Sequence, residues 1–192
     1  MRAITSLIGA AALVVILAPA LAGQKPDAVP VEFTATATAQ TALATATTTL
    51  KIHIEAYTSD RDRNILLSAL RTNGYQNFLP AFRRTPIVGY VQIKDQKWDL
   101  RWASQAVSGS TQTITAATDR PLFFIGGADT DQSKSRRGFE MAVIRLDVDS
   151  SGNGTGVLNA AARVKPNADA TSVIVGDFAD EPVKLTSVTR QK

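Results

Sequence analysis

Residues 139–165 constrain the fold most, because their pattern is that of one long β-hairpin. Alternate side chains of a strand share a face, so one face of the outgoing strand is formed by Ala142, Ile144, Leu146 and Val148. The opposite face is also apolar for half its length, at Phe139, Met141 and Val143. A strand that is apolar on both faces is predicted to be covered on both.

The turn of this hairpin is predicted at residues 150–154 (SSGNG), with its corner at Asn153-Gly154. Asn-Gly is a strong hairpin signal, because both residue types tolerate a positive φ. On the return strand, the alternation predicts one shared face for Leu158, Ala160, Ala162 and Val164. The alanines are small, so a bulky element is expected to pack over them.

The same alternation predicts further strands at residues 50–57, 87–94, 97–107, 111–118, 122–125, 171–178 and 183–189. Residues 31–49 consist almost entirely of Ala and Thr, and they have two interpretations. One is a glycosylated or disordered low-complexity segment. The other is a pair of strands, which we favour because Thr is β-branched and fits a pleated surface.

A helical insertion is predicted over residues 59–82. Ser59 suits the N-cap position, and the acidic residues that follow it suit the positive end of the helix dipole. An apolar stripe at helical spacing is formed by Ile65, Leu66, Ala69 and Leu70. Asn73-Gly74 is predicted to interrupt the helix before a second short piece at 75–82. The insertion is expected to cover one apolar face of the hairpin.

These elements indicate a mainly β fold of about nine strands, which is α+β by strict count. Most connections are short, and short turns join antiparallel neighbours. The predicted architecture is therefore an antiparallel sandwich or a partly closed barrel, with the helix on one side. The expected organisation is a signal peptide at 1–22, a flexible leader at 23–30 and one domain at 31–192.

The N-terminal residues predict export. A basic Arg2, an apolar run at 7–17 and a small-residue site ending at Ala22 follow the pattern of a signal peptide. The run is shorter than the roughly 20 residues that a membrane-spanning helix needs. We expect a soluble periplasmic or extracellular protein with no stable membrane span after cleavage. A retained N-terminal anchor is the alternative.

Composition narrows the choice of partner. The formal net charge is +4, and the basic residues are scattered, so no nucleic-acid partner is predicted. An outer-membrane barrel would need aromatic girdles, and aromatic residues make up only 6% of the chain. There is no cysteine, so disulfides, thiolate metal sites and a cysteine nucleophile are excluded.

No catalytic residue, metal ligand or cofactor site is assigned. The only histidine, His53, lies on the polar face of a strand, and the chain has no Gly-x-Ser-x-Gly elbow. Asp147, Asp149, Ser151 and Gly152 match the start of a calcium loop, but the twelfth position is Leu158 instead of glutamate. An ordinary hairpin turn is the simpler interpretation.

Three residues are the predicted ligand-binding positions. Trp98, Leu100 and Trp102 are expected to share one face of a strand, where they would line an apolar pocket. The same stripe also suits an ordinary protein core. We therefore expect a non-enzymatic exported protein that binds a small apolar ligand or another envelope component. The alternative is a secreted or periplasmic hydrolase with carboxylates that the sequence does not pair.

Three segments carry a resemblance to other proteins: 117–121 (ATDRP), 142–147 (AVIRLD) and 181–185 (EPVKL). They resemble segments of a loose group of exported bacterial proteins of unknown function. The resemblance extends over most of the chain after residue 22. It implies no activity, substrate or site.

Overall fold

The computed structural model describes residues 28–40, 45–122, 138–179 and 181–191. The signal peptide at 1–22, most of the leader at 23–30, nearly all of the strand predicted at 122–125 and the loop that follows it lie outside the described residues. The elements, in order, are β1 (Val31–Gln40), β2 (Thr45–Ile54), α1 (Asp60–Phe82), β3 (Gly89–Ile93), β4 (Gln96–Ser108), β5 (Thr111–Thr118), β6 (Met141–Val148), β7 (Asn153–Pro166), β8 (Val173–Phe178) and β9 (Val183–Gln191).

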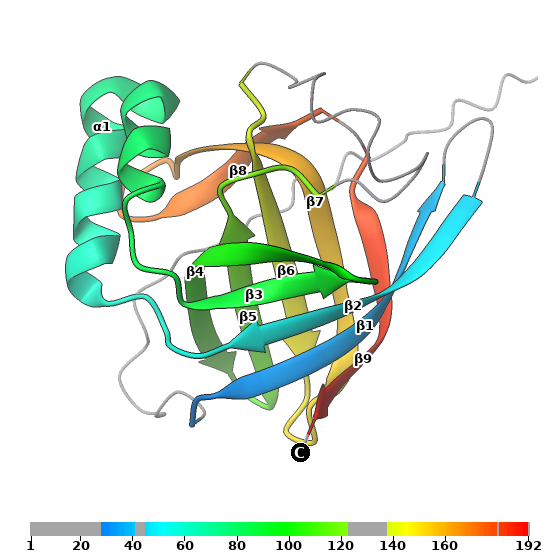
Figure 1. Ribbon diagram of the computed structural model, residues 1–192. Helices are drawn as coiled ribbons and strands as arrows, with labels where there is room; N and C mark the ends of the chain where they lie inside the picture. The colour runs from blue at the N-terminus through cyan, green and yellow to red at the C-terminus, as the bar shows by residue number, and fades with distance from the viewer. Residues whose placement is uncertain (1–27, 41–44, 123–137, 180, 192) are drawn as a thin grey trace, which may run out of the picture.

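Eight of these strands form a closed antiparallel barrel (Figure 1). Neighbours around the ring are β6, β5, β4, β3, β2, β1, β9 and β7, and the pairing of β6 with β7 closes it. The prediction of a mainly β antiparallel fold with one helical insertion is confirmed. Closure satisfies the backbone hydrogen bonds that the edge strands of an open sheet would leave exposed.

The remaining strand, β8, extends the barrel wall beyond its rim. Ala162 of β7 pairs with Met141 of β6 on one edge and with Phe178 of β8 on the other. The N-terminal part of β7, from Asn153 to Leu158, pairs with β9 along the same edge that pairs with β8 in its C-terminal part. The strands β8 and β9 therefore follow one another along the same edge of a single long strand.

The hairpin of β6 and β7 confirms the central prediction from the sequence. The face of β6 formed by Ala142, Ile144, Leu146 and Val148 lies in the barrel interior. Met141 and Val143, on the opposite face, lie in a second core under the helix. The single face predicted for β7 is wrong, because Leu158 and Ala160 face the interior whereas Ala162 and Val164 face the helix. A β-bulge between the pairs Met141–Ala162 and Val143–Asn159 causes the change, since one extra residue reverses the side-chain alternation.

The hairpin turn lies within the predicted stretch, at residues 150–152, but not at the Asn-Gly pair. Asn153 and Gly154 already belong to β7, and the positive φ of +83° is found at Gly152. The carboxylate of Asp149 accepts hydrogen bonds from the backbone N–H groups of Ser151 and Asn153, at 2.8 and 3.1 Å, and from the Ser151 hydroxyl at 2.6 Å. An aspartate-centred turn thus competes successfully with the Asn-Gly signal.

These bonds predict a pH-dependent hairpin. The Ser151 hydroxyl, and then the Asn153 and Ser151 amides, lower the pKa of Asp149 from 3.8. Because the pKa is lowered on folding, Asp149 stabilises the turn above its unfolded pKa, and this contribution is lost as the pH falls through the folded pKa. We expect Ser151→Ala to raise the pKa of Asp149 toward its ordinary value, measured by NMR titration. Ser150→Ala, its exposed neighbour, should leave the titration unchanged.

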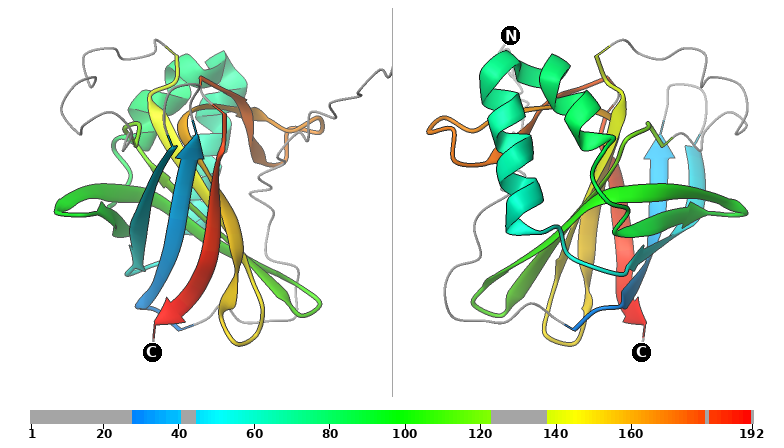
Figure 2. Two further views of the ribbon diagram at one scale, coloured as in Figure 1. Left: turned by 90° about the vertical axis from the view of Figure 1, so that its right-hand side faces the viewer. Right: turned by 60° about the vertical axis from the view of Figure 1, so that its left-hand side comes forward.

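The helix packs on the outside of the barrel, at the end away from the C-terminus (Figure 2). Ser59 is its N-cap and accepts a hydrogen bond from the Asp62 amide, as predicted. Asn73 and Gly74 have non-helical dihedrals and divide α1 into two pieces. The predicted apolar stripe is confirmed at Leu66 and Leu70, which are buried, but Ile65 is exposed and Leu67 is buried in its place.

Candidate binding site

A narrow apolar crevice lies between α1 and the outer wall of the barrel. Its roof is formed by α1, its floor by β4 to β7 and one side by β8. The lining residues are Leu66, Phe78, Phe82, Trp102, Thr115, Ala117, Met141, Val143, Val164, Val173, Ile174 and Val175. The exposed wall is entirely apolar, and the cavity volume is about 20 Å³, which is enough for about one water molecule.

The strand register explains how the floor forms. Trp102 pairs with Ala117, and Ala117 pairs with Val143, so these side chains form one row across β4, β5 and β6. Small residues in the floor leave room for the aromatic residues of the roof. Phe78 and Phe82 stack with their ring centroids 5.4 Å apart.

This row continues into β7 with a buried polar residue, Asn159. It pairs with Val143, a floor residue of the crevice, and Val143 faces the core under α1. Asn159 is 0% exposed, and in the part of the chain that the structure describes neither its Oδ1 nor its Nδ2 has a hydrogen-bond partner. A buried amide without partners costs about 1–3 kcal/mol. Such a group needs an explanation, and a polar atom of a ligand is one.

Polar groups also lie next to the crevice where α1 meets the start of β6. The Tyr75 ring stacks on Phe78, which lines the roof, at 6.3 Å between centroids. The Tyr75 hydroxyl accepts a hydrogen bond of 3.3 Å from the Glu140 amide. Burial, and then the negative charge of Glu140, raise the pKa of Tyr75 well above its ordinary value, so the phenol stays neutral.

On the opposite side, the wall becomes charged at the strand position paired with Thr115, a lining residue of the crevice. Arg145 pairs with Thr115, and its guanidinium donates hydrogen bonds to Asp147 Oδ1 from Nε at 3.2 Å and from Nη2 at 3.1 Å. The Thr113 hydroxyl donates to the same oxygen at 2.6 Å. The apolar crevice therefore ends beside the Arg145–Asp147 ion pair and the Thr113 hydroxyl that donates to it.

The three predicted ligand-binding residues do not share one face. Leu100 is in the barrel interior and 0% exposed, and Trp98 packs partly against this interior core. Trp102 lies in the other core and lines the crevice. A β-bulge in β4 between Leu100 and Trp102 turns Trp102 outward, so the predicted common face is wrong. A ligand-binding role for these residues stays a prediction.

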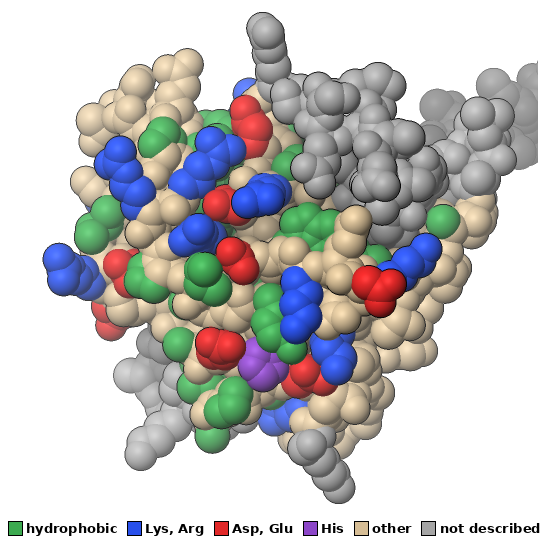
Figure 3. Space-filling view, in the orientation of Figure 1, with side chains coloured by type: hydrophobic (Ala, Val, Ile, Leu, Met, Phe, Trp, Pro, Cys, Tyr) green, Lys and Arg blue, Asp and Glu red, His purple; other side chains and the backbone are tan. Residues whose placement is uncertain are grey.

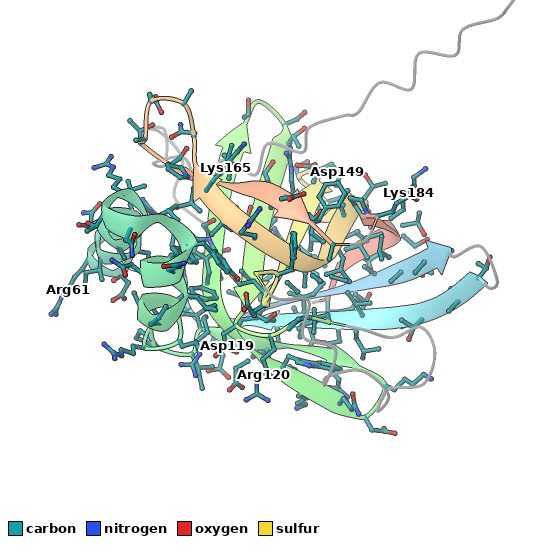
Figure 4. All side chains as sticks on the ribbon, turned by 90° about the horizontal axis from the view of Figure 1, so that it is seen from above. Arg61, Asp119, Arg120, Asp149, Lys165 and Lys184 are labelled. Carbon is teal, nitrogen blue, oxygen red and sulfur yellow. The ribbon has the colours of Figure 1, made fainter. Side chains whose placement is uncertain are left out.

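Trp98 lines a second, polar hollow of about 240 Å³. The other lining residues are Gln96, Lys97, Asp99, Asp119 and Arg120. Asp119 and Arg120 lie side by side (Figure 4). This hollow and the crevice lie on different parts of β4, since Trp98 lines one and Trp102 lines the other.

His53 lies on the outer face of β2, between acidic side chains (Figure 3). Its Nδ1 is 3.5 Å from Glu32 Oε2, and its Nε2 is 3.9 Å from Glu55 Oε1. The imidazole stacks on Tyr90 at 4.9 Å between ring centroids. These contacts place His53 in a half-buried surface network of charged and aromatic groups.

Two features are absent from the residues that the structure describes. These residues contain no cluster of three or more histidine or carboxylate side chains placed to hold a metal ion. They also contain no helix with the length and hydropathy required to cross a membrane.

A comparison with known proteins finds no family model, no curated protein and no solved structure that matches the chain.

Proposed function

We propose that this protein is an exported, non-enzymatic binding protein for a small, mainly apolar ligand, which it takes into the crevice between α1 and the barrel. The observation that supports this most directly is Asn159, a fully buried amide without a hydrogen-bond partner among the described residues, which pairs across the strands with Val143, a lining residue of the wholly apolar cavity. Pockets that bind small molecules typically combine apolar walls with a few placed polar groups. The ligand would have an apolar body and one hydrogen-bonding group.

The crevice must widen to admit such a ligand, because about 20 Å³ holds little more than one water. The roof suits this change. Non-helical dihedrals at Asn73 and Gly74 divide α1 into two pieces, so the Phe78 and Phe82 part can tilt separately from the Leu66 part. The export component of the proposal is supported by the signal-peptide pattern of residues 1–22.

The chain offers a direct probe of the crevice, because Trp98 and Trp102 are its only tryptophans. In a Trp98→Phe protein, the emission of Trp102 reports on the crevice alone. We expect decanol to change this emission saturably. Cyclohexane, which has no hydrogen-bonding group, should bind more weakly. The proposal is abandoned if neither molecule binds saturably.

Asn159→Leu is the decisive variant. Leucine is similar in size and needs no hydrogen bond, so the unliganded protein should gain about 1–3 kcal/mol in free energy of unfolding. The variant should bind decanol about tenfold more weakly, which corresponds to about 1.4 kcal/mol for the lost hydrogen bond. Cyclohexane should bind it as it binds the parent protein.

The measurements are urea unfolding and the Trp102 titration. Thr155→Val, an exposed change elsewhere on β7, is the matched control and should alter neither. A loss of stability in Asn159→Leu, together with unchanged decanol binding, would contradict the role given to the amide.

A further inference from the structure

The polar hollow beside Trp98 lies where the barrel wall separates. The β4–β5 ladder begins at the pair Leu100–Thr118, whereas β4 pairs with β3 from Gln96 onward. Residues 96–99 of β4 therefore have ladder partners on one edge, and their other edge faces the chain that leaves β5 at Asp119. The hollow of about 240 Å³ occupies this gap, and it has room for several water molecules.

The lining combines a flat aromatic surface with many hydrogen-bonding groups. Trp98 is half-buried against the interior core, so its indole ring is held by packing while part of it stays exposed. Asp99 and Asp119 supply acceptors, Lys97 and Arg120 supply donors, and Gln96 supplies both. An aromatic face beside groups of this kind suits a ligand with an apolar face and a rim of hydroxyl groups.

One of the acceptors is held in position before any ligand arrives. Asp119 Oδ2 is 3.4 Å from Arg101 Nε, and its Oδ1 is 3.9 Å from Arg120 Nε. Arg101 is itself fixed, because its Nη1 donates a 2.7 Å hydrogen bond to the Thr85 carbonyl. Preorganised polar groups lower the entropy cost of binding.

The charges of the lining select against ionic ligands. Two carboxylates and two cationic side chains surround the same space, so an anion meets Asp99 and Asp119 and a cation meets Lys97 and Arg120. Lys97 lines the hollow, but its ammonium group contacts the Tyr90 ring, with Nζ 4.1 Å from the ring centroid. A neutral molecule with many hydroxyl groups avoids both repulsions.

We propose that the hollow formed by Trp98, Asp99, Asp119 and Arg120 binds one ring of a neutral pyranose sugar. The indole covers the apolar face of the ring, and the Asp119–Arg120 pair and Asp99 bind its hydroxyl groups. This site is separate from the apolar crevice, and the proposal of a sugar site does not depend on ligand binding in the crevice.

A Trp102→Phe protein makes Trp98 the only tryptophan and thus the reporter of the hollow. Glucose, galactose, N-acetylglucosamine and choline are titrated against it. We expect a saturable change in Trp98 emission with at least one of the sugars, with a dissociation constant of roughly 1 mM for so small a ligand. Choline should give none. Saturation by choline alone would identify a cation site and overturn the proposal, as would the absence of any saturable change.

Two variants test the assignment by saturation-transfer NMR, which needs no tryptophan. Asp99→Asn is an exposed change that should preserve the fold and weaken sugar binding at least fivefold. Trp98→Leu removes the flat surface and should abolish binding. Asp95→Asn, in the neighbouring turn and outside the lining, is the control and should bind like the parent. Equal binding by the parent and Asp99→Asn, with binding retained in Trp98→Leu, overturns the proposal.

Discussion

Replacement of Phe82 by alanine is expected to lower the free energy of unfolding by about 3–5 kcal/mol. Phe82 is 1% exposed, closes the roof of the crevice and stacks on Phe78. Its removal eliminates a large part of the contacts that attach the second piece of α1 to the barrel wall, and it leaves a cavity that the surrounding structure refills only partly. Urea unfolding followed by circular dichroism measures the loss.

The same variant should acquire a binding property. An engineered apolar cavity tends to stay dry and to accept small apolar molecules. Benzene should therefore raise the unfolding midpoint of Phe82→Ala by mass action, and it should affect the parent protein less. Phe178→Ala is the control, because Phe178 is 40% exposed on β8 and its loss should cost under about 1 kcal/mol. Equal losses in the two variants would show that α1 is not held by its apolar roof.

Gly89→Ala is expected to destabilise the barrel by at least about 3 kcal/mol. Gly89 has a φ of +152°, where side chains are strained, and an added methyl group would overlap the backbone carbonyl of His53 on β2. Because backbone atoms cannot move aside cheaply, the pairing of β2 with β3 must open. Thermal unfolding monitored by circular dichroism measures this loss.

Gly109→Ala separates the overlap from the dihedral strain. Gly109 lies in the turn between β4 and β5 with a φ of +60°, and an added methyl group would meet nothing within 4 Å. Strain alone should cost about 1–2 kcal/mol there. If Gly89→Ala costs no more than Gly109→Ala, close approach of β2 and β3 does not explain the glycine.

The elements with strong local signals were predictable from the sequence. Ser59 caps α1 and Asn73-Gly74 interrupts it, because both effects act within one helical turn. The sequence also correctly predicted that both faces of β6 are apolar and covered. One face lies toward the barrel interior and the other toward the helix. Each of these features depends on contacts between residues close in the chain or on a simple two-residue alternation.

The errors concentrate at β-bulges and at the hairpin turn. A bulge adds one residue to one strand, and its position depends on the partner strand, so the alternation of Trp98, Leu100 and Trp102 did not reveal that Trp102 turns outward. The bulge in β7 misplaced Ala162 and Val164 for the same reason. At the turn, the hydrogen bonds of the Asp149 carboxylate outweighed the Asn-Gly preference.

The residues that line the two hollows were predicted only in part. Trp98 and Trp102 do line hollows, although two different ones. Asn159 was missed, and its signal was present: it is a polar residue between Leu158 and Ala160 in an apolar stretch of strand. A buried polar residue becomes informative only when its hydrogen-bond partners are known, and that requires the tertiary structure.

By itself, the amino-acid sequence determined that this chain forms antiparallel strands with one interrupted helix, since alternation, caps and breakers are local properties. Only the tertiary structure decided that β6 meets β7 to close a barrel, that α1 covers its outer wall, and that Trp98 and Trp102 line separate hollows. Barrel closure and bulge positions depend on pairings between residues distant in the chain, and no short stretch of sequence encodes them.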